Sequence, residues 1–118
     1  MPMTLSLAPD MLATIRDYLQ KEILPTLDDD KWFNVKVAVN LLATIERELR
    51  QGPAADEEER ARLAALLGTS GTLGELNRAL ALAIREGRIA LDDPGLLDHL
   101  RQTTADALRI NNPQWLGR

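Results

Sequence analysis

The chain has 118 residues, of which 45% are hydrophobic and 27% are charged, and its formal net charge is −4. These values are typical of a single globular domain and not of a disordered chain. The acidic balance argues against nucleic acid as a partner, because affinity for phosphate backbones comes from clustered Lys and Arg. The lack of cysteine excludes disulfides, thiolate zinc sites and cysteine nucleophiles.

Hydrophobic periodicity predicts an all-α fold. Apolar residues recur at helical spacing, and no alternating β-branched run is bounded by hairpin turns. The predicted helices cover residues 9–24, 31–50, 56–67, 73–86 and 94–111. Short connections favour antiparallel neighbours. We therefore expect one domain over 1–118, a compact bundle of about five helices, with a short flexible N-terminus at 1–7 and a tail at 113–118.

Local signals predict where these helices begin and end. Asp and Thr cap a helix by accepting hydrogen bonds from its first amides, whereas Gly and Pro end helices or occupy their first turn. The acidic opening of the third helix, 56–59, would lie at the positive end of the helix dipole. The expected caps and stops are Pro25, Asp30, Gly52-Pro53, Gly68, Thr72 with Glu75, Gly87, Asp93-Pro94 and Asn112-Pro113.

The same periodicity predicts which side of each helix is buried. We expect Leu41 and Leu80 to lie on buried stripes. The predicted buried residues are Ala8, Met11, Leu12, Ile15, Tyr18, Leu19 and Ile23; Phe33, Val37, Leu41 and Ile45; Leu63, Leu66 and Leu67; Leu73, Leu76, Leu80, Ala83 and Ile84; and Leu97, Leu100, Ala107 and Leu108.

The second predicted helix is apolar on more sides than the others, because Val35 and Val39 widen its apolar arc beyond the predicted core stripe. Such a helix is either central in its bundle or covered by a partner. Asn40 borders the arc, and Asn77 has a similar place on the fourth helix. Each amide either forms a helix-to-helix hydrogen bond or anchors a binding surface. The candidate partner interface comprises Phe33, Val35, Lys36, Val39 and Asn40.

Catalytic and metal chemistry find little support in the sequence. His99 is the only histidine, which excludes a di-iron bundle, and we expect it at the surface or half-buried. The two serines, Ser6 and Ser70, stand outside a nucleophile elbow. Residues 68–74 lack the Gly-Lys-Ser/Thr ending of a phosphate loop. We expect no catalytic residue, cofactor or metal, although carboxylate-only chemistry stays open as an alternative.

Targeting signals are also lacking from the sequence. The N-terminus has no basic segment followed by a long apolar run, which predicts no signal peptide. No stretch approaches the ~20 apolar residues of a membrane helix. We therefore expect a cytoplasmic protein without membrane contact.

The order of motifs along nearly the whole chain resembles an uncharacterised bacterial family of small helical proteins. The matching stretches are Tyr18-Leu19, Ile23-Leu24-Pro25, 33–48 with Lys36-Val37-Ala38 and Asn40, Gly52-Pro53, Arg60-Ala61-Arg62-Leu63, Leu76-Asn77, Ile84-Arg85-Glu86-Gly87, Leu100-Arg101-Gln102-Thr103-Thr104 and Asn112-Pro113. Asn34 departs from the histidine of that pattern, and Gln114-Trp115 departs from its basic residue and tyrosine.

Members of that family tend to be encoded beside kinases resembling aminoglycoside phosphotransferases and beside acyl-CoA dehydrogenases. The resemblance therefore implies a noncatalytic accessory subunit that binds such a kinase in hydroxyacyl-CoA catabolism. The chain itself lacks the parts of a kinase, such as a glycine-rich loop after a strand. The alternative is a self-associating helical domain whose homodimer is the functional object.

Overall fold

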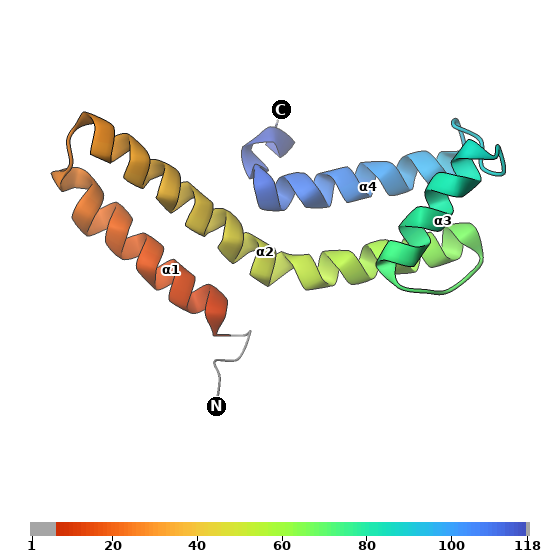
Figure 1. Ribbon diagram of the computed structural model, residues 1–118, viewed down its shortest axis with the longest axis horizontal. Coiled ribbons are helices and arrows are strands. Elements are labelled where there is room, and N and C mark those ends of the chain that lie inside the picture. Colours follow the sequence, from red (N-terminus) through yellow and green to blue (C-terminus); the bar gives the residue numbers. More distant parts are fainter. Residues whose placement is uncertain (1–6, 118) are drawn as a thin grey trace. The chain divides into compact units, whose positions relative to one another are not determined.

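The computed structural model describes residues 7–117, which are all-α as predicted. Over these residues the chain forms four α-helices and no strand (Figure 1). The helices are α1 at Ala8–Tyr18, α2 at Asp29–Leu67, α3 at Leu73–Arg85 and α4 at Pro94–Asn111. The predicted number of about five helices is wrong, because the second and third predicted helices are parts of α2. None of the described helices is both long and apolar enough to cross a bilayer.

The residues of the chain group into two compact units, Met1–Gly52 and Pro53–Arg118. We call them the N-terminal unit and the C-terminal unit. The N-terminal unit contains α1 and the first part of α2. The C-terminal unit contains the rest of α2 together with α3 and α4. The sequence predicts one domain over 1–118, and its residues group into these two units, each of which is described by itself.

Gly52-Pro53 does not end a helix, contrary to prediction, and α2 continues through both residues. Proline has a backbone φ that fits a helix, and its cost comes from the missing N–H and from its ring clashing with the preceding turn. Ala54 and Ala55 follow, and alanine is the strongest helix former. Residues 56–59 consequently lie inside α2, so the predicted interaction of their charges with a helix N-terminus is also wrong.

The N-terminal unit is a helical hairpin. After α1 the chain makes a π-helical turn at Leu19–Ile23 and a 3-10 turn at Leu24–Thr26, and α2 then begins at Asp29. Pro25 therefore ends the first helical segment close to the predicted position. Asp30 was predicted to cap the second helix from outside, and it lies instead in the first turn of α2. The described part of the expected flexible segment 1–7 is Leu7, which precedes α1; the remainder of that segment lies outside the described residues.

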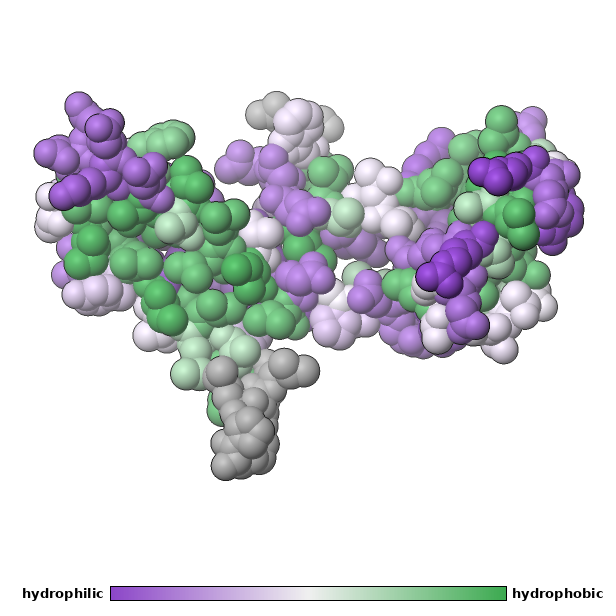
Figure 2. All heavy atoms as spheres, in the orientation of Figure 1, coloured by the Kyte–Doolittle hydropathy of each residue, from purple (hydrophilic) through white to green (hydrophobic). Residues whose placement is uncertain are grey.

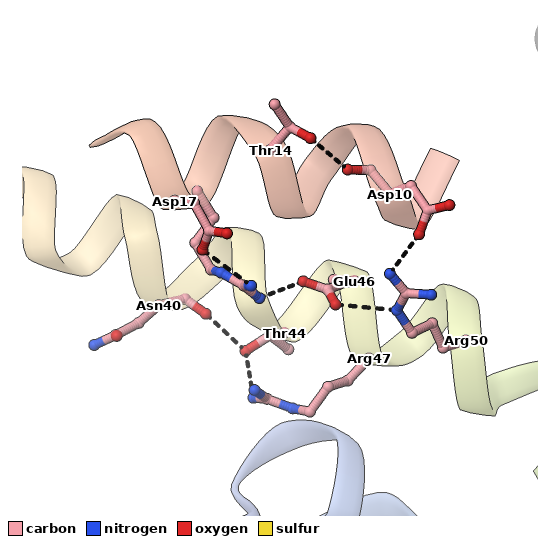
Figure 3. Close-up of polar contacts among 9 residues, drawn as sticks. Asp10, Thr14, Asp17, Asn40, Thr44, Glu46, Arg47 and Arg50 are labelled. Carbon is pink, nitrogen blue, oxygen red and sulfur yellow. Dashed lines mark hydrogen bonds and ion pairs between the residues drawn. The ribbon is translucent and has the colours of Figure 1, made fainter. Parts of the chain in front are cut away.

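Ion pairs set the register of the hairpin (Figure 3). Glu46 of α2 accepts a hydrogen bond from Arg16 of α1 and a second from Arg50, whose Nε lies 3.0 Å from Oε2. Arg50 Nη2 also reaches Asp10 Oδ1 at 2.9 Å. The Glu46 side chain is only 14% exposed. Because Glu46 bonds an arginine of α1, the side of α2 that carries Glu46 faces α1.

The C-terminal unit has a compact leucine core. Leu63 of α2, Leu76 and Leu80 of α3, and Leu96 of α4 form one buried cluster. The predicted buried stripe of α3 is confirmed, since Leu76, Leu80 and Ala83 are buried. A hydrogen bond from Asn77 Nδ2 to Glu59 Oε2, at 3.2 Å, also joins α3 to α2. The helix-to-helix alternative for Asn77 therefore holds.

Most of the predicted helix ends in the C-terminal unit are confirmed. Thr72 and Glu75 form the expected capping box. The Asp93 side chain accepts hydrogen bonds from two amides at the start of α4. Gly68 and Gly87 have φ values of 68° and 75°, in the left-handed region that favours glycine at a helix end. Within the expected tail, Pro113–Gly117 forms a short 3-10 helix, η3.

The buried side of α4 differs from the predicted one. Leu96, His99 and Ile110 are buried, whereas Leu97, Leu100 and Ala107, which were predicted to be buried, are exposed. The two predicted leucines lie next to the buried positions, so the apolar pattern allows two orientations of the helix. Packing of Leu96 into the leucine core selects the orientation that is observed.

Candidate protein interface

The first part of α2 carries two apolar stripes. The stripe that faces α1 contains Val35 and Val39, which the sequence analysis placed outside the predicted core stripe. Val39 is 2% exposed, and Val35 and Leu42 are half-buried. Residues 35, 39, 42 and 46 share one side of a helix, so these three side chains face α1 together with Glu46. Leu41 is 59% exposed, and its predicted place in the core is wrong.

The second stripe of α2 and a stripe of α1 leave large apolar side chains in solvent. Each of these side chains is at least 40% exposed. We call this surface the hairpin face, and it comprises Leu7, Met11, Ile15 and Tyr18 at or in α1 and Phe33, Val37, Leu41 and Ile45 in α2. The sequence predicted Phe33, Val37, Ile45 and every α1 member except Leu7 to be buried. Their exposure shows that this prediction is wrong.

Both stripes lie on the same side of the hairpin. At about 100° per residue, the centre of each stripe lies about 150° behind the packed side of its own helix, in the same rotational sense. Because α1 and this part of α2 run antiparallel, equal offsets in the same sense place both stripes on one side. Figure 2 shows apolar side chains gathered in this way over the N-terminal unit. The hairpin face is thus one continuous surface.

The predicted interface residues separate in the structure. Phe33 belongs to the hairpin face and is 63% exposed. Asn40 is exposed, and Val35 and Lys36 are half-buried. Val39 packs inside the hairpin, so its side chain is not available to a partner and its predicted interface role is corrected. Contact of the other four residues with a partner stays a prediction.

One signal in the sequence could have identified the hairpin face. Glu46 continues the spacing of Val35, Val39 and Leu42, and Arg16 lies on the apolar side of α1. Opposite charges within two apolar stripes indicate the sides that face each other, because a half-buried charge needs a partner. The remaining apolar stripe of each helix is then the outer one.

A second apolar surface lies on the C-terminal unit. Leu116 of η3 and residues of α4 line a groove of about 360 Å³. The groove is lined by Leu97, Leu100, Arg101, Thr104, Ala105, Leu108 and Leu116. Arg101 forms no ion pair with any residue of the described part of the chain. We call this surface the α4 groove, and it offers an apolar trough bordered by one cation.

His99 is buried, 4% exposed, which corrects the expectation that it lies at the surface or is half-buried. Its Nδ1 accepts a hydrogen bond from Arg62 Nε at 3.4 Å, and Arg62 Nη2 donates to Thr103 Oγ1 at 3.1 Å. These contacts link α2 to α4 beside a pocket of about 340 Å³ that also receives Asp98. Within residues 7–117 no three His, Asp or Glu side chains gather in a way that could hold a metal ion.

Burial of His99 makes the stability of the C-terminal unit depend on pH. Burial lowers the pKa of His99, and the charge of Arg62 lowers it further, whereas Glu59 and Asp98 oppose the change. The unfolded chain therefore binds more protons than the folded chain just below the ordinary pKa of about 6.5. The stability that neutral His99 contributes to the folded state is complete above that pKa and is lost as the pH falls.

We therefore expect the thermal midpoint to decrease between about pH 7.5 and pH 5.5, the window in which an ordinary histidine titrates. Circular dichroism melts of the wild type and His99→Gln measure it, since glutamine can still accept a hydrogen bond from Arg62. The variant should show the smaller decrease. Equal pH dependence in both proteins would contradict a neutral buried His99.

Comparisons with known proteins place most of the chain in one family. Residues 25–115 match the sequence model of a family described as "Domain of unknown function (DUF6285)". The match includes all of α2, α3 and α4, and begins near the end of the first helical segment. No curated protein and no solved structure matches the chain.

Proposed function

The chain belongs to the DUF6285 family, and we propose that it is a noncatalytic accessory subunit that binds an aminoglycoside-phosphotransferase-like kinase in hydroxyacyl-CoA catabolism. The kinase is proposed because the ordered motifs of the chain resemble a family whose members tend to be encoded beside such kinases. The observation that supports binding of a protein is the exposed apolar surface of the described residues. Within a catabolic assembly, such a subunit would bind and steady the enzyme that phosphorylates the hydroxyacid.

That apolar surface is concentrated and not scattered. Single exposed apolar side chains are ordinary on soluble proteins, whereas large continuous patches mark interaction sites. The hairpin face is one such patch, and the α4 groove is another. The groove also carries Arg101, which would attract an acidic group at the edge of a partner. A cation beside an apolar trough favours a partner that is apolar with an acidic flank.

Co-expression with a kinase of that type from the same genome tests the proposal. We expect the chain to be retained when the kinase is captured by an affinity tag, and a charge introduced into the docking surface to abolish retention, because a desolvated charge without a partner is costly. Leu41→Glu probes the hairpin face and Leu100→Glu probes the α4 groove.

Ala81→Glu is the matched control, since Ala81 is exposed on α3 outside both surfaces. The proposal requires retention of the wild type and of Ala81→Glu, with loss in at least one of the two test variants. A wild-type chain that is not retained would contradict it. So would retention of both Leu41→Glu and Leu100→Glu.

A further inference from the structure

We infer that the hairpin face is covered by a second copy of this chain, so that two α1–α2 hairpins close into a four-helix bundle. The inference concerns one of the two surfaces that support the proposed function, and it requires no kinase. It rests on the small interior of the N-terminal unit, on the size of the hairpin face and on its lack of charge.

The N-terminal unit buries little by itself. Its buried hydrophobic side chains within the described residues are Leu24 and Val39, together with Pro9 of α1. The C-terminal unit buries six, including the leucine core. Helices in proteins gain most of their stability from packing of an apolar side against a neighbouring element. A hairpin with fewer fully buried than exposed large apolar side chains would therefore be stabilised by a partner that covers the exposed ones.

The size of the hairpin face suits a stable dimer. Its eight side chains are 40–63% exposed. At roughly 100 Å² for each half-exposed large side chain, the face presents on the order of 800 Å², which is the amount each partner buries in a standard protein interface. A symmetric dimer would bury this area twice with the same residues.

The chemistry of the face favours a second copy over another kind of partner. A two-fold interface brings a patch against itself, so charges in the patch would oppose like charges. The other residues that lie along the α2 stripe between its two ends, Asn34, Asn40 and Thr44, are polar but uncharged. Asp30 and Glu48 continue the α2 stripe at its two ends, and both are exposed, so they lie at the rim. Homodimer interfaces are also the more apolar class.

The geometry of a helical hairpin favours the same occupant. Two antiparallel helices with apolar stripes on one side are half of a four-helix bundle, whose core is closed by another such pair. α1 and the first part of α2 form such an antiparallel pair within one chain. Tyr18 and Phe33 would be the main anchors, because buried aromatic side chains dominate interface energies.

Size-exclusion chromatography with light scattering tests the inference on the wild-type chain at micromolar concentration. We expect a mass twice the 13.1 kDa of one chain. Leu41→Glu should shift the mass to that of one chain, because the glutamate would be buried without a partner. Gln20→Glu, which adds the same charge at an exposed position outside the hairpin face, should remain dimeric.

Leu100→Glu is the second control, because it makes the same substitution in the α4 groove, and it should also remain dimeric. A wild-type mass of one chain would overturn the inference, even if the kinase still binds. A dimeric Leu41→Glu, or a monomeric Leu100→Glu, would place the dimer contact elsewhere and would overturn it too.

Discussion

Replacing Leu80 with alanine is expected to lower the free energy of unfolding of the C-terminal unit by about 2–5 kcal/mol. Leu80 is 6% exposed and belongs to the leucine core with Leu63, Leu76 and Leu96. Truncation removes buried methyl groups and leaves a cavity that the neighbouring helices fill only in part. The loss is a large fraction of the ~5–15 kcal/mol stability of a typical domain. Urea unfolding followed by circular dichroism measures it.

Leu82→Ala provides the control on the same helix. Leu82 is 47% exposed, and we expect its truncation to cost about 1 kcal/mol or less, as surface substitutions do. The contrast between two leucines separated by one residue reports the orientation of α3 directly. Equal losses at the two positions would show that the buried side of α3 is assigned incorrectly.

Replacing Pro53 with alanine is expected to stabilise the chain by about 3 kcal/mol, which is the usual cost of proline inside a helix. Because Pro53 lies in the interior of α2, its ring excludes an N–H that would otherwise bond the carbonyl of Leu49. Alanine restores the hydrogen bond and removes the clash. The measurement is the urea midpoint together with the helical signal in circular dichroism.

Pro94→Ala is the matched control, because Pro94 occupies the first turn of α4, where its missing N–H costs nothing. We expect little gain there. If Pro53→Ala also gave no gain, or lowered stability, the chain would break at Gly52-Pro53 in solution and the helix end predicted from the sequence would be correct after all.

Helix ends were predictable from the sequence because short-range chemistry decides them. The side chains of Thr72, Glu75 and Asp93 form hydrogen bonds with backbone groups at the starts of their helices. The two glycines with positive φ end the preceding helices. These local effects do not depend on the rest of the chain. Gly52-Pro53 is the exception. A glycine followed by a proline does not end the helix there, because strong helix formers follow and the φ of proline is compatible with a helix.

Buried sides were harder to predict because α1, α2 and α4 are apolar on two sides. In α4 the neighbours Leu96 and Leu97 fit either orientation, and contact with the leucine core decides between them. In α2 the pairing of Glu46 with Arg16 decides. Such choices depend on tertiary partners, which periodicity alone does not contain.

The candidate site was predictable only in part, for the same reason. The sequence indicated that the second predicted helix has more apolar surface than its own packing requires, and the structure agrees. It assigned the surplus to Val35 and Val39, whereas the exposed stripe contains Phe33 and Leu41. Inverting the two sides of one helix moved its exposed stripe into the predicted core.

Hydrogen exchange at two protein concentrations tests most directly whether the hairpin face is stabilised by a second copy. We expect the amides of α1 and of residues 33–48 to lose protection on dilution, because their packing is linked to association. The amides of α3 and of most of α4 serve as the internal control, since the leucine core lies within one chain, and their protection should not change. If the protection of the N-terminal unit were as independent of protein concentration as that of α3 and α4, the claim that a second copy stabilises the hairpin face would be contradicted.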